Sequence, residues 1–381
     1  MNHIEKIKLI ALSCAILLAG NIINAQENVN ELIGSIKKQL APDSRIAIVD
    51  IKANESNGKW ILKGKVDNNI LKHQILQNLS ANGVKYIDSI SVLEYTQKKP
   101  WAVVKLAIAS HRTGGKHAAE MATQTIMGTP VKILEYSGDW ARVQTPDEYI
   151  SYVPSNSLHK MTQIEFDAWR KSKRYIVTEY QTELADANGN TVSDLVMGNI
   201  LEYKGENGDK IELSTPDGRI GYVNKNEVKE LSAWANQTFD AEFISKVAHR
   251  LMGHGYLWGG TSTKVTDCSG LVKVSYFANG IILHRDASQQ ALIGNVMKAE
   301  DWKKAELGDL LFFGTKSGRV THVAIYLKDG EYIHCSGRVK LNSVDPQADN
   351  YLTTPFLSMT RINGKIGTRG ITMVKDHIWY F

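Results

Sequence analysis

Residues 256–278 read YLWGGTSTKVTDCSGLVKVSYFA, and this stretch decides how the C-terminal part of the chain is interpreted. A glycine-broken loop leads to Cys268, and the apolar residues after Cys268 recur at helical spacing as far as Asn279-Gly280. The pattern predicts a helix that begins at Cys268. Because a helix N-terminus offers unpaired N–H groups and a positive partial charge, it favours a thiolate and can hold an oxyanion. Cys268 is therefore a candidate nucleophile.

Two histidines follow on segments that are predicted to be adjacent strands. His322 and His334 flank the short loop 328–330. A three-residue loop pairs Leu327 with Glu331 and places both imidazoles on one face of the sheet, whereas a two-residue loop would place them on opposite faces. The order predicts a nucleophile, a base and a second imidazole that orients the base.

Other interpretations of these residues stay open. A lone cysteine before a helix is more often a buried residue than a nucleophile, and two histidines on adjacent strands could be surface residues or metal ligands, although no third ligand has suitable spacing. Cys335 is expected to be a packed thiol, with a disulfide to Cys268 as the minor alternative. The occurrence of Cys268, His322 and His334 in this order favours the nucleophile.

The composition restricts the class of protein. The chain has 381 residues, of which 43% are apolar, and its formal net charge is +5. This length favours several domains, and this composition excludes wholesale disorder. No run of like charges and no interleaving of Arg with aromatic residues is present, so we expect no nucleic acid partner.

The first residues carry the pattern of a secretory signal. Lys6 and Lys8 precede the apolar stretch 9–20, and the small residue Ala25 follows. The apolar stretch is shorter than the ~20 residues that a membrane span requires. We therefore expect export to the periplasm or cell envelope, with no integral membrane span after cleavage.

An internal repeat with an offset of 70 residues lies upstream of the cysteine. Thr145-Pro146-Asp147 recurs as Thr215-Pro216-Asp217, and Gly128 recurs as Gly198. Each copy is predicted to be a small barrel of short strands. The expected domains are a signal peptide (1–25), an α+β module (26–96), a first barrel (97–161), a linker helix (162–174), a second barrel (175–232) and an α+β domain (236–381).

Four short sequence motifs of the C-terminal domain carry a family resemblance, namely residues 256–260, 267–270, 322–326 and 333–337. With them, the chain from about Phe239 onward resembles the NlpC-type cell-wall cysteine peptidases. The two barrels resemble bacterial SH3-like domains, and the N-terminal module resembles BON-like domains of bacterial envelopes. The resemblance implies a papain-like fold for the last domain, and hence an α+β fold class.

The same resemblance assigns catalytic roles. Cys268 would be the nucleophile, His322 the base and His334 the residue that orients it. The hydroxyl of Tyr256 would join the backbone N–H of Cys268 at the oxyanion site.

Two SH3-like barrels before such a domain resemble the subgroup that cleaves γ-D-glutamyl–L-diamino-acid bonds in murein peptides. In that subgroup the aspartate of an Arg-Asp motif binds the free amine of the terminal L-Ala. The motif is Arg285-Asp286 in this chain, which implies this role for Asp286. The first barrel contributes an acid and a tyrosine, for which Glu120 and Tyr149 are the candidates. Asp267 and Ser269, on either side of the nucleophile, complete the expected substrate-binding residues.

The leading hypothesis is a secreted cysteine endopeptidase for peptidoglycan-derived peptides with a free N-terminal L-Ala. Ala287 stands where a hydroxyl residue commonly follows the aspartate, so one substrate hydrogen bond is not expected. A thiol acyltransferase or amidase, and a wall-binding protein with an inactive peptidase domain, are the alternatives. We expect a monomer with no cofactor and no metal.

Overall fold

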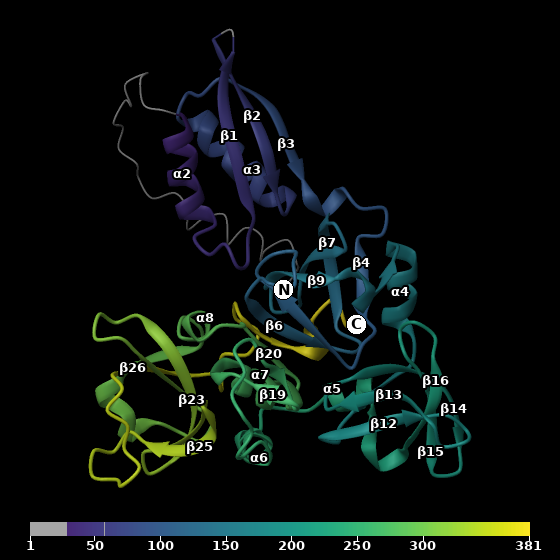
Figure 1. The fold of residues 1–381 in the computed structure, drawn as a ribbon. Coiled ribbons are helices and arrows are strands. Elements are labelled where there is room, and N and C mark those ends of the chain that lie inside the picture. Colours follow the sequence, from purple (N-terminus) through teal and green to yellow (C-terminus); the bar gives the residue numbers. More distant parts are fainter. Residues whose placement is uncertain (1–28, 57) are drawn as a thin grey trace, which may run out of the picture. The chain divides into compact units, whose positions relative to one another are not determined.

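The structure, a computed structural model, describes residues 29–56 and 58–381 (Figure 1). The chain divides into two compact units, and the larger comprises Leu93–Phe381 together with the short segment Arg45–Ala47. The predicted signal peptide lies outside the described residues. In the described part of the chain, no helix is long and apolar enough to cross a membrane.

The smaller unit is a three-stranded sheet with two helices, in the order helix, strand, strand, helix, strand. β1 pairs antiparallel with β2, and β2 pairs parallel with β3. The side chain of Asn68 caps the second helix by accepting the N–H of Leu71 at 2.9 Å. The first strand begins at Val49. The elements are α2 (Val29–Leu40), β1 (Val49–Ser56), β2 (Lys59–Val66), α3 (Asn69–Ala81) and β3 (Tyr86–Val92).

The first barrel is a seven-stranded antiparallel sheet in the order β10-β4-β7-β8-β9-β5-β6. Its core consists of small and branched apolar side chains, among them the fully buried Val104, Ile133 and Val153. The strands are β4 (Trp101–Val104), β5 (Ile108–Arg112), β6 (Met121–Ile126), β7 (Pro130–Ser137), β8 (Trp140–Gln144), β9 (Ile150–Pro154) and β10 (Leu158–Met161).

The second barrel repeats this topology, because its order β17-β11-β14-β15-β16-β12-β13 matches the first barrel strand by strand. The predicted linker helix is α4 (Gln163–Lys171) between the barrels, and it begins with a capping box of Thr162 and Glu165. The strands are β11 (Arg174–Val177), β12 (Gln181–Ala185), β13 (Thr191–Val196), β14 (Ile200–Asn207), β15 (Lys210–Ser214), β16 (Ile220–Asn224) and β17 (Val228–Glu230).

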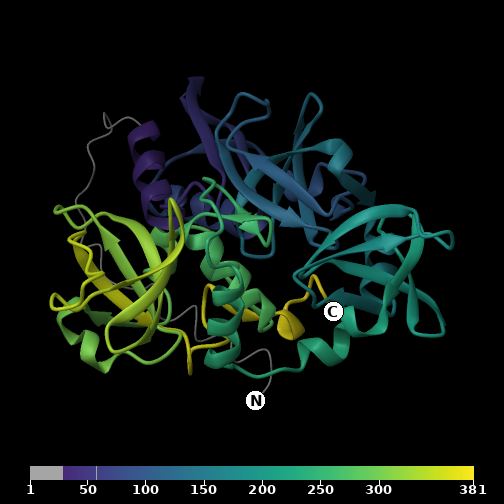
Figure 2. The ribbon, with the colours of Figure 1, turned by 60° about the horizontal axis from the view of Figure 1, so that its bottom comes forward.

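The C-terminal domain packs helices against a six-stranded antiparallel sheet in the order β21-β26-β22-β23-β24-β25. Figures 1 and 2 show its helices, in green, between this yellow-green sheet and the second barrel, in teal. The helices are α5 (Leu231–Ala235), α6 (Ala241–Arg250), α7 (Cys268–Ala278) and α8 (Ala287–Gln290). The sheet strands are β21 (Asn295–Lys298), β22 (Leu310–Gly314), β23 (Val320–Lys328), β24 (Glu331–Ser336), β25 (Arg338–Ser343) and β26 (Phe356–Arg361). Short pairs are formed by β18 (Thr261–Ser262) with β19 (Val265–Thr266) and by β20 (Ile281–Leu283) with β27 (Ile371–Met373).

Close packing fixes the start of α7. A Cβ atom added to Gly270 would lie 1.9 Å from the carbonyl oxygen of Gly260. The apolar side of α7 then enters the core of the domain, where Leu271 and Val272 join Val323 of the sheet in one buried cluster. The glycine-broken loop, the helix N-terminus and β23 are therefore held in contact.

Candidate active site

Cys268 is the first residue of α7, as the sequence predicted. Asp267 caps the helix, because its carboxylate accepts the N–H of Gly270 at 2.7 Å. The side chain of Cys268 is buried, and it joins the core cluster that contains Val323. The nucleophile candidate therefore lies against the strand that carries His322.

The thiol of Cys268 is protonated in the free protein. Burial, followed by the charge of Asp267, raises the pKa of the Cys268 thiol to about 12, although backbone N–H groups of Val323 and Ser269 stabilise the anion. The thiolate predicted from the helix terminus alone is therefore wrong for the resting protein. The partial charge of the helix is outweighed by desolvation and by the adjacent carboxylate.

The hairpin between β23 and β24 differs from the prediction in its turn. Lys328 pairs with Glu331, which leaves the two-residue turn Asp329-Gly330, and both turn residues have positive φ angles of 49° and 83°. An irregularity between Tyr326 and Lys328 adds one residue to the first strand, and Tyr326 pairs with Tyr332. The bulge offsets the shorter turn. The two histidines therefore still share one face of the sheet.

The imidazoles form a chain with an asparagine. Nε2 of His322 lies 2.7 Å from Nδ1 of His334, and Nε2 of His334 lies 2.9 Å from Oδ1 of Asn342. The amide nitrogen of Asn342 donates to the carbonyl of Asn350 at 2.6 Å, which directs its oxygen to the imidazole. His334 therefore donates from Nε2, and its Nδ1 accepts the N–H of His322. Nδ1 of His322 is left unprotonated and able to receive a proton.

Both imidazoles are neutral at physiological pH. Burial, followed by the neighbouring His334, lowers the pKa of His322 to about 3. Burial lowers the pKa of His334 to about 4, although its hydrogen bond to Asn342 acts in the opposite direction. A neutral buried thiol packed against the strand that carries a neutral imidazole is compatible with general-base activation of sulfur.

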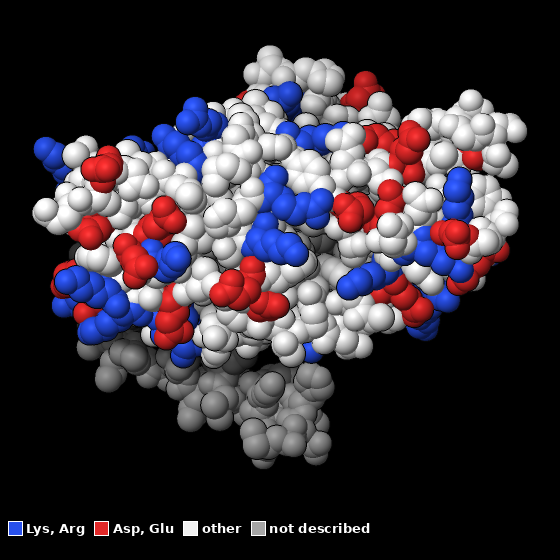
Figure 3. Space-filling model, turned by 90° about the horizontal axis from the view of Figure 1, so that it is seen from below, with Lys and Arg blue, Asp and Glu red and all other residues white. Residues whose placement is uncertain are grey.

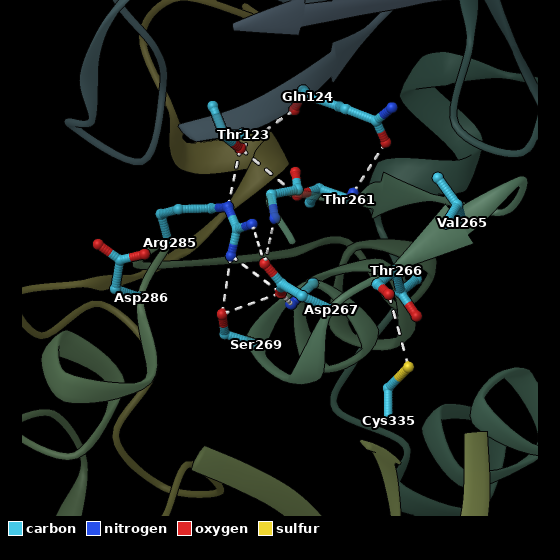
Figure 4. Close-up of polar contacts among 12 residues, drawn as sticks. Thr123, Gln124, Thr261, Val265, Thr266, Asp267, Ser269, Arg285, Asp286 and Cys335 are labelled. Carbon is cyan, nitrogen blue, oxygen red and sulfur yellow. Dashed lines mark hydrogen bonds and ion pairs between the residues drawn. The ribbon is translucent and has the colours of Figure 1, made fainter. Parts of the chain in front are cut away.

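Tyr256 lies in the same site. Burial raises the pKa of its phenol, and the neighbouring Cys268 and Asp267 raise it further. The phenol is therefore protonated and can act as a hydrogen-bond donor. Cys335 is a free, fully buried thiol whose Sγ lies 3.5 Å from the carbonyl of Thr266, as Figure 4 shows. The packed thiol is confirmed.

The carboxylate of Asp267 connects several parts of the site. Besides the helix cap, it accepts the N–H of Gly259 at 2.9 Å and the hydroxyl of Ser269 at 3.2 Å. The buried guanidinium of Arg285 pairs with the same carboxylate (Figure 4). Both Asp267 and Ser269, predicted to bind substrate, thus have partners inside the protein.

Arg285 connects this network to the first barrel. Its Nη1 donates to Ser269 at 2.7 Å, and its Nε donates to the hydroxyl of Thr123 on β6 at 2.9 Å. Figure 4 shows the guanidinium between Thr123 and Asp267. The first barrel therefore supports the N-terminus of the nucleophile helix through a side chain that is 1% exposed.

The structure brings Asp286 and Tyr149 together. The phenol of Tyr149 hydrogen-bonds to Asp286, and burial followed by this carboxylate raises the pKa of the phenol. Tyr149 is buried in the first barrel, whereas Asp286 directly precedes α8. The barrel and the C-terminal domain thus form one polar site.

Glu120 does not join this pair. Its side chain is exposed, and its carbonyl accepts the N–H of Thr113 at 2.9 Å. Within residues 29–56 and 58–381, no hydrogen bond or ion pair joins Glu120 to Asp286 or Tyr149.

Asn342 and Arg285 belong to the site, although the sequence alone predicted no role for either residue. Asn342 has no motif, and its place beside His334 depends on the register in which Tyr332 pairs with Asn342. Arg285 is part of the Arg-Asp motif, and a buried arginine requires a carboxylate partner. The structure supplies that partner in Asp267.

The fold and site define a cysteine hydrolase of the papain type: a buried cysteine at a helix N-terminus lies against a sheet that carries two linked histidines. Residues 253–361 match the NlpC/P60 family, and residues 112–158 match the bacterial dipeptidyl-peptidase SH3 domain. The chain therefore contains an NlpC/P60 cysteine peptidase domain and a bacterial SH3 domain.

Several known proteins are similar over most of their own length. Dipeptidyl-peptidase 6 of Lysinibacillus sphaericus is 29% identical over 266 residues, which are 64% of this chain and 92% of the relative. The γ-D-glutamyl-L-lysine dipeptidyl-peptidase of Bacillus cereus is 26% identical and covers 61% of this chain and 73% of its own. A crystal structure of an NlpC/P60 family protein from Bacillus cereus superimposes with a TM-score of 0.60 at 20% identity, covering 68% of this chain and 99% of that chain. The last similarity concerns the fold.

Proposed function

We propose that this protein is an exported cysteine endopeptidase that hydrolyses γ-D-Glu–L-diamino-acid bonds in peptidoglycan peptides with a free N-terminal L-Ala. The observation that carries the proposal is the pair of Asp286 and Tyr149 in the same unit as Cys268. The dipeptidyl-peptidase names of the relatives agree with it. Acidic and basic side chains are interspersed on the face in Figure 3.

The reaction starts with general-base activation of the thiol. As the sulfur of Cys268 attacks the carbonyl carbon of the γ-D-Glu bond, the thiol proton moves to Nδ1 of His322. The oxyanion accepts hydrogen bonds from the backbone N–H of Cys268 and the phenol of Tyr256. His334 accepts the N–H of His322 and fixes its orientation.

The second half of the reaction returns the site to its starting state. The imidazolium of His322 gives its proton to the amine of the diamino acid, which leaves as the C–N bond breaks. Water, deprotonated by the same imidazole, then attacks the thioester and releases L-Ala-γ-D-Glu. The proton returns to the sulfur of Cys268.

The carboxylate of Asp286 accounts for the requirement for a free amine. An ammonium group gains a charged hydrogen bond there, whereas an N-acylated stem peptide leaves the carboxylate without a cation. Tyr149 keeps its proton and donates to Asp286, which orients the carboxylate.

The test is incubation with L-Ala-γ-D-Glu-diaminopimelate, with released diaminopimelate measured by mass spectrometry. Wild type should release it, Cys268→Ala should release none, and the other cysteine provides the matched control because Cys335→Ala should remain active. An inactive wild type, or an active Cys268→Ala variant, would falsify the proposal. Export is tested separately by N-terminal sequencing of the envelope fraction.

A further inference from the structure

The segment Arg45–Ala47 belongs by its contacts to the larger unit. The N–H of Ile150, at the start of β9, donates to the carbonyl oxygen of Arg45 at 2.6 Å. Ile150 directly follows Tyr149 in the chain. The backbone of Arg45 is therefore held next to the proposed amine site.

The side chain of Arg45 reaches into that site. Its Nη1 lies 2.8 Å from Oδ2 of Asp286, and it also donates to the hydroxyl of Ser288 at 3.1 Å. These are the contacts that an ammonium group would make with a carboxylate and a neighbouring hydroxyl. Arg45 thus presents a cation of this chain to the carboxylate that the substrate would use.

The carboxylate of Asp286 already accepts a hydrogen bond from the phenol of Tyr149. A guanidinium and an ammonium on the remaining positions would be like charges within a few ångströms of each other, which is unfavourable. Simultaneous occupation by Arg45 and a substrate amine is therefore disfavoured. One cation must leave before the other binds.

We propose that Arg45 is an intramolecular competitor that occupies the position of the substrate's N-terminal ammonium. This inference rests on the proposed function, because it gives Asp286 the role of amine acceptor. The ion pair is partly open to solvent, with side-chain exposures of 38% for Arg45 and 28% for Asp286. Such a pair is weak, so Arg45 acts as a displaceable competitor that raises the KM for substrate by about threefold.

Kinetics with the full chain test the competition. Arg45→Ala should lower the KM for L-Ala-γ-D-Glu-diaminopimelate about threefold and leave kcat unchanged. Arg45→Lys keeps a cation and should stay close to wild type, and Lys229→Ala, which removes an exposed cation of the second barrel, is the matched control. An unchanged or increased KM in Arg45→Ala would overturn the proposal, since Arg45 would then be neutral or would assist binding.

Calorimetric titration separates this result from failure of the proposed function. In a Cys268→Ala background, the additional Arg45→Ala change should tighten binding of the tripeptide about threefold and leave its N-acetylated form unaffected. This readout does not require cleavage, so it applies even if wild type fails to hydrolyse the peptide. Equal affinities with and without Arg45, or no binding to either variant, would refute the competition.

Discussion

The two barrels have the same strand order and the same Thr-Pro-Asp motif, but the aspartate of the motif has different partners in the two copies. In the first barrel, Asp147 forms a buried ion pair with Lys273 of α7, with Nζ 2.6 Å from Oδ2. In the second, the corresponding Asp217 pairs with its own neighbour Arg219 at 3.0 Å, near the surface. The same local motif therefore contacts α7 in the first copy, whereas in the second copy Asp217 pairs with Arg219 of its own turn and, at 3.8 Å, with Lys105 of the first barrel.

Two residues after the aspartate, the copies differ again. Tyr149 of the first barrel reaches Asp286, whereas Arg219 at the equivalent position donates to the carbonyl of Lys105 at 2.9 Å. The barrel topology alone thus does not determine which contacts the side chains make. Side chains at a few equivalent positions connect the first barrel to Asp286 and α7 and give the second barrel other partners.

The largest difference between the barrels should appear in the two aspartates. Asp147→Asn leaves the buried cation of Lys273 without a counter-charge and should lower the free energy of unfolding by about 3–5 kcal/mol. Asp217→Asn weakens an exposed pair and should cost under about 1 kcal/mol. Urea denaturation measures both. The double change Asp147→Asn with Lys273→Met should restore most of the loss, and equal costs for the two aspartates would contradict the comparison.

A buried histidine distinguishes the barrel cores. His111 lies opposite Thr123 in the first barrel, and Leu184 lies opposite Ser193 in the second. Burial lowers the pKa of His111 to about 4, so between pH 6.5 and 4 the unfolded chain binds the proton more readily. His111 should therefore cause a loss of up to about 3 kcal/mol of stability as pH falls through this range.

Acid unfolding measured between pH 7 and pH 4 checks this expectation. His111→Gln should show a smaller loss of stability than wild type. His73→Gln, which changes an exposed histidine of the smaller unit, should follow wild type. If His111→Gln keeps the full pH dependence, the buried histidine is not its source.

The next expected effect concerns the loop before Cys268. The amide oxygen of Gln124 accepts the N–H of Thr261 at 2.9 Å and the hydroxyl of Ser262 at 3.0 Å. Gln124→Ala should lower the free energy of unfolding by about 2 kcal/mol, because buried donors lose their acceptor. The equivalent Asp194 makes an exposed pair, and Asp194→Ala should cost under about 0.5 kcal/mol in the same urea assay. If Gln124→Ala and Asp194→Ala lowered the free energy of unfolding by similar amounts, the proposed difference between the two positions would be wrong.

The smallest effect is on substrate binding. Tyr149→Phe removes the hydrogen bond to Asp286, worth about 1 kcal/mol, and should raise the KM for the free-amine tripeptide about fivefold with little change in kcat. Arg219→Ala, at the equivalent position of the second barrel, should leave KM unchanged. Steady-state kinetics measure KM in both variants. An equal rise of KM in Tyr149→Phe and Arg219→Ala would contradict a specific role for Tyr149.

The sequence predicted the elements of this molecule better than their connections. Helix α7 follows from the apolar spacing after Cys268, and the repeat follows from two copies of one motif. Both are local patterns. The length of the turn at Asp329-Gly330 was predicted wrongly, because the β-bulge before it depends on packing between strands. The bulge compensates for the shorter turn, so the two histidines still share one face of the sheet.

Long-range pairs escaped prediction for a physical reason. Asp147 and Lys273 are 126 positions apart, and nothing in either segment specifies the other until the barrel packs on α7. Asn342 meets His334 only through the register of β24 with β25. Tyr149 was identified through the family resemblance, and no local pattern would have selected it.

The protonated state of Cys268 has a consequence for chemical durability. Peroxide reacts with thiolates and hardly with thiols, so a buried sulfur that holds its proton is slow to become a sulfenic acid. In the proposed mechanism, reactivity arises when a peptide carbonyl lies beside the sulfur and His322 removes the proton. We therefore expect Cys268 to be oxidised slowly in the free protein, as long as the thiol keeps its proton.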